Sequence, residues 1–121
     1  MRVLIVDDNP DILSSVSMGL KHKGFEVEGY EDPEEALREF RPGKYDVAIL
    51  DVRMPKMNGF QLYREILKID PNVRVRFFTA FEEYRMEFRQ AFPELDQANF
   101  IKKPASIAEI VEEISTPLIR K

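Results

Sequence analysis

Three carboxylates, one hydroxyl and one ammonium are the groups of this chain that could do chemistry together. They belong to residues that each follow a short apolar run: Asp7 and Asp8, Asp51, Thr79, and the Lys102-Lys103 pair. Carboxylates held close together raise one another's pKa, so they need a compensating cation. Oxygen donors without His or Cys suit Mg²⁺, which keeps several waters and accepts phosphate oxygens. These residue types therefore predict a Mg²⁺ site that can receive a phosphoryl group.

The apolar runs before these residues are typical of buried strands. They cover residues 3–6, 47–50, 73–78 and 100–101. Segments with helical spacing lie between the runs, and this alternation favours βαβ units and a parallel sheet. In an open parallel sheet, ligands bind outside the carboxyl ends of the strands. We therefore expect the polar residues to meet at one edge of the sheet.

Helix starts and a half-exposed strand complete the expected domain. Asn9, Asp32 and Ser106 can cap helices, and the last two begin capping boxes. Polar and apolar residues alternate over 25–30, as in an edge strand. Residues from about 82 to 92 read as a fourth helix with the least regular pattern. The sequence thus predicts five strands and five helices in a single domain, residues 1–121.

Composition and charge exclude some classes of function. The formal charge of −4, from 18 basic and 22 acidic residues, gives no positive field that would attract nucleic acid. The chain has no Cys, which excludes disulfides and thiolate metal sites. Apolar stretches are far shorter than the ~20 residues that cross a membrane. We expect a cytoplasmic protein that binds neither nucleic acid nor a membrane by itself.

Four short motifs together resemble the receiver domain of two-component response regulators, over residues 1 to about 116. In chain order they are Asp7-Asp8, Asp51 with Met54-Pro55 and Asn58-Gly59, Thr79-Ala80, and Lys103-Pro104. Any one of them is a common combination, but their order and their places at strand ends are specific. The resemblance implies an α/β three-layer sandwich, flavodoxin-like (βα)5, with a five-stranded parallel sheet of order 2-1-3-4-5.

The resemblance also implies which residues handle the phosphoryl group. Asp51 is the nucleophile that becomes an aspartyl phosphate, and Thr79 and Lys103 each hold one phosphoryl oxygen. Lys102 is the competing lysine. Lys103 is preferred because it directly precedes Pro104, and in this family that peptide bond is typically cis.

The Mg²⁺ ligands and a switch residue follow from the same resemblance. Asp8 and Asp51 are implied as direct ligands together with the backbone carbonyl of Arg53, while Asp7 acts mostly through bound water. Phe100 is implied as the aromatic residue whose rotamer follows the phosphorylation state. Burial in the core alone would also account for an aromatic side chain at this position.

The expected function is that of a phosphoacceptor in signalling. A histidine kinase or phosphorelay protein supplies the phosphoryl group, and the domain passes the signal to a downstream protein as a monomer or as a phosphorylation-dependent dimer. It is not an independent enzyme. The alternatives are a receiver fragment of a larger multidomain regulator or hybrid kinase, a flavodoxin-like nucleotide or flavin binding module, and a metal-dependent phosphohydrolase. Absorbance would test for flavin, and turnover of an aryl phosphate would test for a hydrolase.

Several residues depart from the usual family pattern, including the segment 93–98, which replaces the usual Ala-Gly pair. Arg74 and Arg76 share one face of the fourth strand with Phe78, although that strand is normally apolar, and Ala105 stands where a Phe is common. An unpaired buried charge is costly. Arg76 should therefore reach a strand edge or pair with a carboxylate of Glu82, Glu83 or Glu87. We expect this cation to lie beneath the fourth helix and to loosen its packing.

Overall fold

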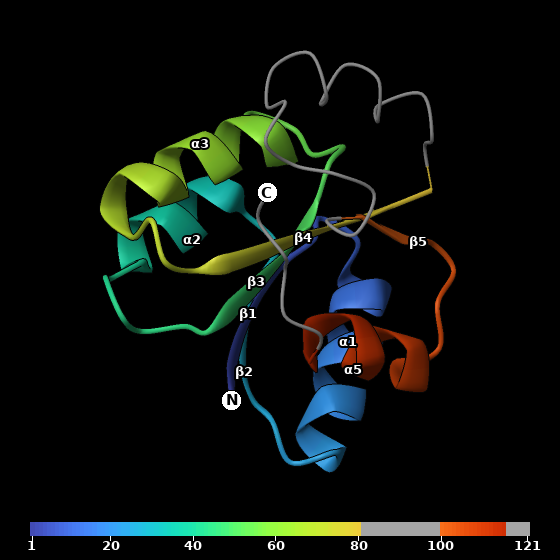
Figure 1. Cartoon of the computed structure of the whole chain (residues 1–121). Coiled ribbons are helices and arrows are strands. Elements are labelled where there is room, and N and C mark those ends of the chain that lie inside the picture. Colours follow the sequence, from blue (N-terminus) through green and yellow to red (C-terminus); the bar gives the residue numbers. More distant parts are fainter. Residues whose placement is uncertain (81–99, 116–121) are drawn as a thin grey trace.

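A parallel β-sheet forms the centre of the protein (Figure 1). The computed structural model describes residues 1–80 and 100–115. The strands are β1 (Arg2–Val6), β2 (Glu26–Tyr30), β3 (Val47–Asp51), β4 (Arg74–Thr79) and β5 (Phe100–Lys102). All neighbouring strands are parallel, and their order is β2-β1-β3-β4-β5. The predicted fold class and strand order are confirmed.

Helices cover both faces of this sheet. Two of them, α1 (Pro10–His22) and α5 (Ile107–Ser115), lie on one face, whereas α2 (Pro33–Glu39) and α3 (Gly59–Ile69) lie on the other (Figure 1). The arrangement is the predicted three-layer sandwich. The helix predicted over residues 82–92 lies outside the described residues.

Because both faces are covered, each strand sends alternate side chains into two separate cores. The core beneath α2 and α3 receives from the strands Leu4, Val6, Ala48, Leu50, Val75, Phe77 and Phe100. The core beneath α1 and α5 receives Val3, Ile5, Val47, Ile49, Phe78 and Ile101. Consecutive residues such as Phe77 and Phe78 therefore point into opposite layers.

Side-chain caps fix where three of the helices begin. Asn9 accepts two amide hydrogen bonds at 3.0 and 3.2 Å at the start of α1. Ser106 and Glu109 form the predicted capping box of α5, with reciprocal bonds of 3.1 and 3.2 Å. The capping box predicted at Asp32 is not found in the described part of the chain, where Asp32 caps α2 by accepting a hydrogen bond from the amide of Glu34 at 2.9 Å. Each cap satisfies amide groups that the first helical turn leaves unpaired.

Arg76 corrects one of our expectations. It is 1% exposed, so its guanidinium does not extend along a strand edge into water. Its side chain points toward α5, and its Nε donates to the carbonyl of Glu113 at 3.2 Å. That carbonyl is free to accept because the last carbonyls of a helix have no partner within the helix. The carboxylates we expected as alternative partners lie outside the described residues.

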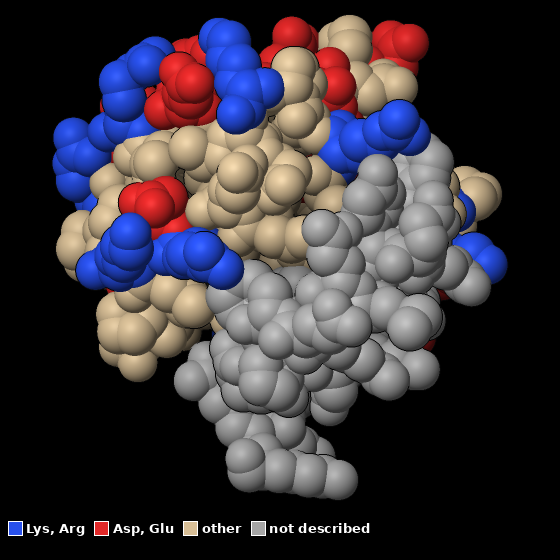
Figure 2. Space-filling model, turned by 90° about the horizontal axis from the view of Figure 1, so that it is seen from above, with Lys and Arg blue, Asp and Glu red and all other residues tan. Residues whose placement is uncertain are grey.

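The face that carries α3 shows how surface charges are distributed. Charges of both signs lie next to one another along the margin of its described part, and uncharged side chains occupy the middle (Figure 2). On α3 itself, Lys68 pairs with Glu65 at 3.0 Å. Such exposed pairs contribute little to stability, typically less than about 1 kcal/mol. They give this face a mixed field instead of a patch of one sign.

Candidate functional site

Neighbouring strands bring the polar residues of the sequence motifs to one edge of the sheet. Asp7 and Asp8 follow β1, Asp51 ends β3, Thr79 ends β4 and Lys103 follows β5. One carboxylate oxygen from each of the three Asp residues lies within 4.8 Å of the other two. The first and third of these carboxylates are buried, whereas the second is exposed. The edge therefore presents acidic groups that are open to solvent from one side.

Lys103 is the cation of this cluster. Its Nζ lies 2.9 Å from Asp7 Oδ2 and 3.5 Å from Asp51 Oδ1. The other oxygen of Asp7 accepts a hydrogen bond from the amide of Asn9 at 3.0 Å. The competing residue, Lys102, ends β5 and is exposed. Among the described residues, the cluster thus holds three carboxylates and one ammonium, which contacts two of them, and two negative charges remain when all of these groups are ionised.

The excess negative charge acts on Asp51. Burial and the neighbouring charge of Asp7 raise the pKa of Asp51 to about 7, although the Lys103 ammonium and a hydrogen bond from the Arg53 backbone lower it. A divalent cation would relieve this repulsion. Arg53 and the three carboxylates also line an open cavity of about 500 Å³. Hard oxygen donors beside a solvent-filled space fit Mg²⁺, which retains several waters when it binds.

Thr79 and Lys103 are joined through their backbones. Thr79 is 5% exposed, and its carbonyl accepts a hydrogen bond from the Lys103 amide at 3.0 Å. The peptide bond between Lys103 and Pro104 is cis, as the resemblance implies. The two residues expected to hold phosphoryl oxygens therefore sit at the ends of adjacent, hydrogen-bonded strands.

The loop after Asp51 is closed against the start of α3. The amide of Gly59 donates to the carbonyl of Val52 at 2.9 Å. A Cβ atom on Gly59 would lie 2.3 Å from the carbonyl oxygen of Asp51, so only glycine fits there. Asn58 and Gln61 form a capping box with two bonds of 2.9 Å. We did not predict this cap, although the spacing of Asn and Gln was its sequence signal.

Phe78 is a second feature that sequence reasoning missed. The Nζ of Lys103 lies 5.0 Å from the centroid of the Phe78 ring, within the range of a cation–π contact. The ring is 4% exposed. In a strand buried on both faces, a Phe is expected at any core position, whether its ring contacts a cation or only apolar atoms. No signal in the sequence could have found it.

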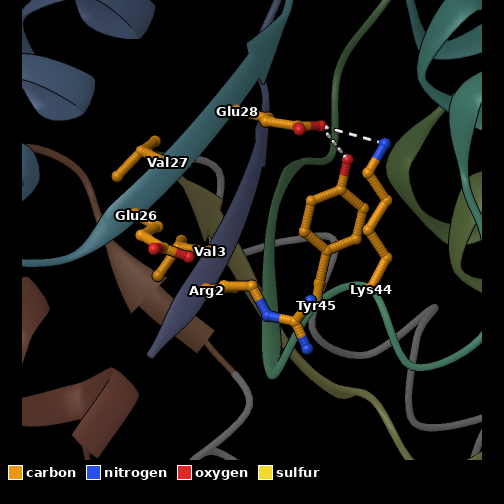
Figure 3. Close-up of a pocket in the computed structure, with 7 residues that line it drawn as sticks. All are labelled: Arg2, Val3, Glu26, Val27, Glu28, Lys44 and Tyr45. Atoms are coloured by element: carbon orange, nitrogen blue, oxygen red, sulfur yellow. Dashed lines mark hydrogen bonds and ion pairs between the residues drawn. The ribbon is translucent and has the colours of Figure 1, made fainter.

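A different polar cluster lines a cavity of about 330 Å³ beside β1 and β2. The carboxylate of Glu28 is directed toward both the hydroxyl of Tyr45 and the ammonium of Lys44 (Figure 3). The hydroxyl donates to this carboxylate, and the ammonium lies 3.3 Å from it. Burial, followed by the neighbouring Glu28, raises the pKa of Tyr45. These groups satisfy one another, and they tie β2 to the segment before β3.

The site geometry and the fold agree with comparisons of the whole sequence. The sequence model of the response regulator receiver domain matches residues 3–115. The chain belongs to this family. The receiver is 33% identical over 120 residues to the transcriptional regulatory protein PrrA of Mycobacterium bovis, an alignment that covers 99% of this chain and 51% of PrrA. It is 31% identical over 115 residues to the chemotaxis protein CheY of Thermotoga maritima, with 94% of both chains covered.

Solved receiver structures have the same fold. A CheY-like receiver domain from Methanospirillum hungatei superposes with a TM-score of 0.81 at 28% identity, covering 94% of this chain and 90% of the other. The response regulator TrrA of Thermotoga maritima, in complex with Mg²⁺ and BeF, gives a TM-score of 0.80 at 31% identity, with 94% and 96% covered. The chain spans about half the length of PrrA. Family membership identifies it as a receiver of two-component signalling.

The described helices are α1, α2, α3 and α5. Within residues 1–80 and 100–115, none of them combines the length and the hydropathy that crossing a membrane requires.

Proposed function

We propose that this receiver accepts a phosphoryl group on Asp51 in a Mg²⁺-dependent reaction and signals by a change of conformation. The observation that carries the proposal is the Lys103 ammonium, 2.9 Å from Asp7 and 3.5 Å from Asp51, at an edge with three carboxylates. Such a cluster has too much negative charge for a purely structural ion pair. It suits a divalent cation and the phosphoryl group that the cation accompanies.

Asp51 is the nucleophile of the proposed reaction. An oxygen of its ionised carboxylate attacks phosphorus and forms a new P–O bond, while the bond between phosphorus and the donor breaks. The donor leaves with the bonding electrons. The ammonium of Lys103 and the hydroxyl of Thr79 each bind one oxygen of the transferred group, so charge that develops on these oxygens is stabilised.

Four residues would hold the metal ion. Asp8 and Asp51 supply carboxylate oxygens, Arg53 supplies its backbone carbonyl, and Asp7 acts through bound water. When bound, Mg²⁺ neutralises charge on the phosphoryl oxygens. Because Asp7 already has Lys103 and an amide as partners, its charge orients the ammonium and balances the cation at the same time.

The conformational response involves Thr79 and Phe100. A phosphoryl group adds about −1.5 to −2 charges beside Thr79 and draws its hydroxyl inward. Phe100 is 7% exposed and packs against Phe77 at a centroid distance of 5.5 Å, close to the end of β4. Its ring can fill space that Thr79 vacates. The switch is a population shift, so Thr79→Ala should be phosphorylated without the change of the Phe100 ring resonances that wild type shows.

The proposed setting is the cytoplasm. A histidine kinase or phosphotransfer protein supplies the phosphoryl group, and the receiver, residues 1–121, acts as a monomer or as a phosphorylation-dependent dimer without turning over a substrate of its own. The alternative is a receiver within a larger regulator or hybrid kinase. The length of PrrA keeps this alternative open, whereas CheY of Thermotoga maritima is matched over almost its full length.

Acetyl phosphate with Mg²⁺ provides a direct test. Wild type should gain the mass of one phosphoryl group, and Asp51→Asn should gain none. Asp11→Asn is the matched control because Asp11 is an exposed carboxylate that lines the same cavity. It should label like wild type. Labelling of Asp51→Asn at the wild-type rate would show that the acceptor is a different residue.

A further inference from the structure

The ammonium of Lys103 has an aromatic neighbour in addition to its two carboxylates. The Phe78 ring centroid lies 5.0 Å from Nζ, while Asp7 and Asp51 lie at 2.9 and 3.5 Å. The Lys103 side chain is 15% exposed. Water therefore reaches only a small part of it, and a cation over the negative face of a ring is held more strongly where water is largely excluded.

Strand register fixes the ring beside the proposed phosphoacceptor. Phe78 on β4 is paired directly with Asp51 on β3. Residues paired in this way project to the same face of a parallel sheet, so the ring and the carboxylate share the face that α1 covers. On the other side of β4, Phe78 pairs with Ile101 of β5. The backbone that carries the ring is thus fixed between two neighbouring strands.

We propose that Phe78 is a positioning residue that keeps the Lys103 ammonium directed at the acceptor oxygens of Asp51. This inference rests on the proposed phosphoacceptor function. Its physical basis is that the partners of the ammonium respond differently to a metal ion. A hard cation competes with Lys103 for the carboxylates of Asp7 and Asp51, but an aromatic face is no ligand for Mg²⁺. The ring is therefore the one of these three partners that keeps its full attraction for the ammonium when metal binds.

The space next to the ring makes this contact testable without disturbing the fold. Phe78, Lys103 and Ala105 line an apolar cavity of about 340 Å³, so small substituents on the ring have room. Phe77 offers a matched control because it is adjacent in sequence and fully buried. It packs on the opposite face against Phe60 and Tyr63, with centroid distances of 5.3 and 5.6 Å.

The experiment replaces Phe78 by phenylalanine analogues of nearly constant shape, 4-fluoro and 3,4,5-trifluoro, whose ring faces are progressively less negative. Phe78→Leu removes the ring altogether. Loss of a desolvated cation–π contact corresponds to roughly a 5- to 30-fold change. We expect the rate of phosphorylation by acetyl phosphate to fall in that range for Phe78→Leu and by graded, smaller factors for the fluorinated series. The same analogues at Phe77 should leave the rate unchanged.

A second readout separates positioning from stability and needs no phosphodonor. NMR relaxation of the Lys103 ε-methylene group, in metal-free protein, should show increasing motion along the Phe78 series. If wild type is phosphorylated and the variants of the Phe78 series are phosphorylated at the same rate, the inference is overturned. If wild type takes up no phosphoryl group, the proposed function fails instead. In that case, unchanged motion of Lys103 along the series would still overturn the role of Phe78.

Discussion

Two clusters of charged side chains in this protein use similar residue types with a different balance of charge. At the carboxyl ends of the strands, three carboxylates face the single ammonium of Lys103. Beside β2, one carboxylate of Glu28 meets one ammonium of Lys44, and the hydroxyl of Tyr45 completes the group. The first cluster is left with an excess of negative charge that a ligand can relieve. The second is neutral and complete.

The clusters also differ in exposure to water. The Asp7 and Asp51 side chains are 2% and 8% exposed, whereas those of Glu28 and Lys44 are 47% and 32% exposed. Attraction between opposite charges grows as water is excluded, but so does the free energy lost when one partner is removed. The comparison shows why a buried, unbalanced cluster is the better candidate for function and an exposed, balanced one for a modest role in stability.

Removal of each lysine should give the largest contrast. Without divalent cations, Lys103→Met should lower the free energy of unfolding by about 3 kcal/mol because it leaves buried carboxylates uncompensated. Lys44→Met, the matched control, should lower it by less than about 1 kcal/mol. Denaturant titration at a pH above 7, where Asp51 is ionised, measures both. Equal losses in the two variants would remove the distinction between the clusters.

Addition of Mg²⁺ should act on one cluster only. At a free concentration 100 times its Kd, the ion should raise the free energy of unfolding of wild type by about 2.7 kcal/mol. Asp8→Asn should lose most of this gain, since Asp8 supplies one of the three clustered carboxylates. Glu28→Gln should keep it. Thermal unfolding with and without Mg²⁺ makes the measurement, and full stabilisation of Asp8→Asn would exclude Asp8 as a ligand.

The hydroxyl of Tyr45 should have a smaller effect. Tyr45→Phe removes its hydrogen bond to Glu28 and should lower the free energy of unfolding by about 1 kcal/mol. A double-mutant cycle with Glu28→Ala isolates the pair, because each single substitution removes the same hydrogen bond and the two losses should then be clearly less than additive. Additive losses would mean that the two residues act independently.

The smallest effect concerns pH. The hydrogen bond from Tyr45 lowers the pKa of Glu28 below its ordinary value of 4.5. A carboxyl group with a lowered pKa in the folded state binds protons less readily there than in the unfolded chain, so it stabilises the fold above its unfolded pKa. The difference in stability between wild type and Glu28→Gln should therefore be complete above pH 4.5 and should shrink as pH falls below it. A difference that grows with acidification would contradict this assignment.

The places of the site residues at strand ends were easier to predict than the helical layer toward which each strand side chain points. Asp7 and Asp51 follow apolar runs, and parallel topology alone brings the ends of such strands together. For Arg76, alternation shows which residues share its face of β4 but not which helical layer covers that face. That choice depends on the register of Arg76 with Ile49, whose side chain lies in the core beneath α1 and α5. The ring of Phe78 over Lys103 depends on the same three-dimensional register.

The hydrogen bond from Gly59 to Val52 has a mechanical consequence. It closes the loop from Val52 to Gly59, so the conformational entropy of that loop is lost when the chain folds and not when a phosphoryl group arrives. The backbone of Asp51 touches Gly59, the first residue of α3, with no room for a side chain between them. A shift of the Asp51 backbone toward this glycine would therefore have to displace the start of α3 as well.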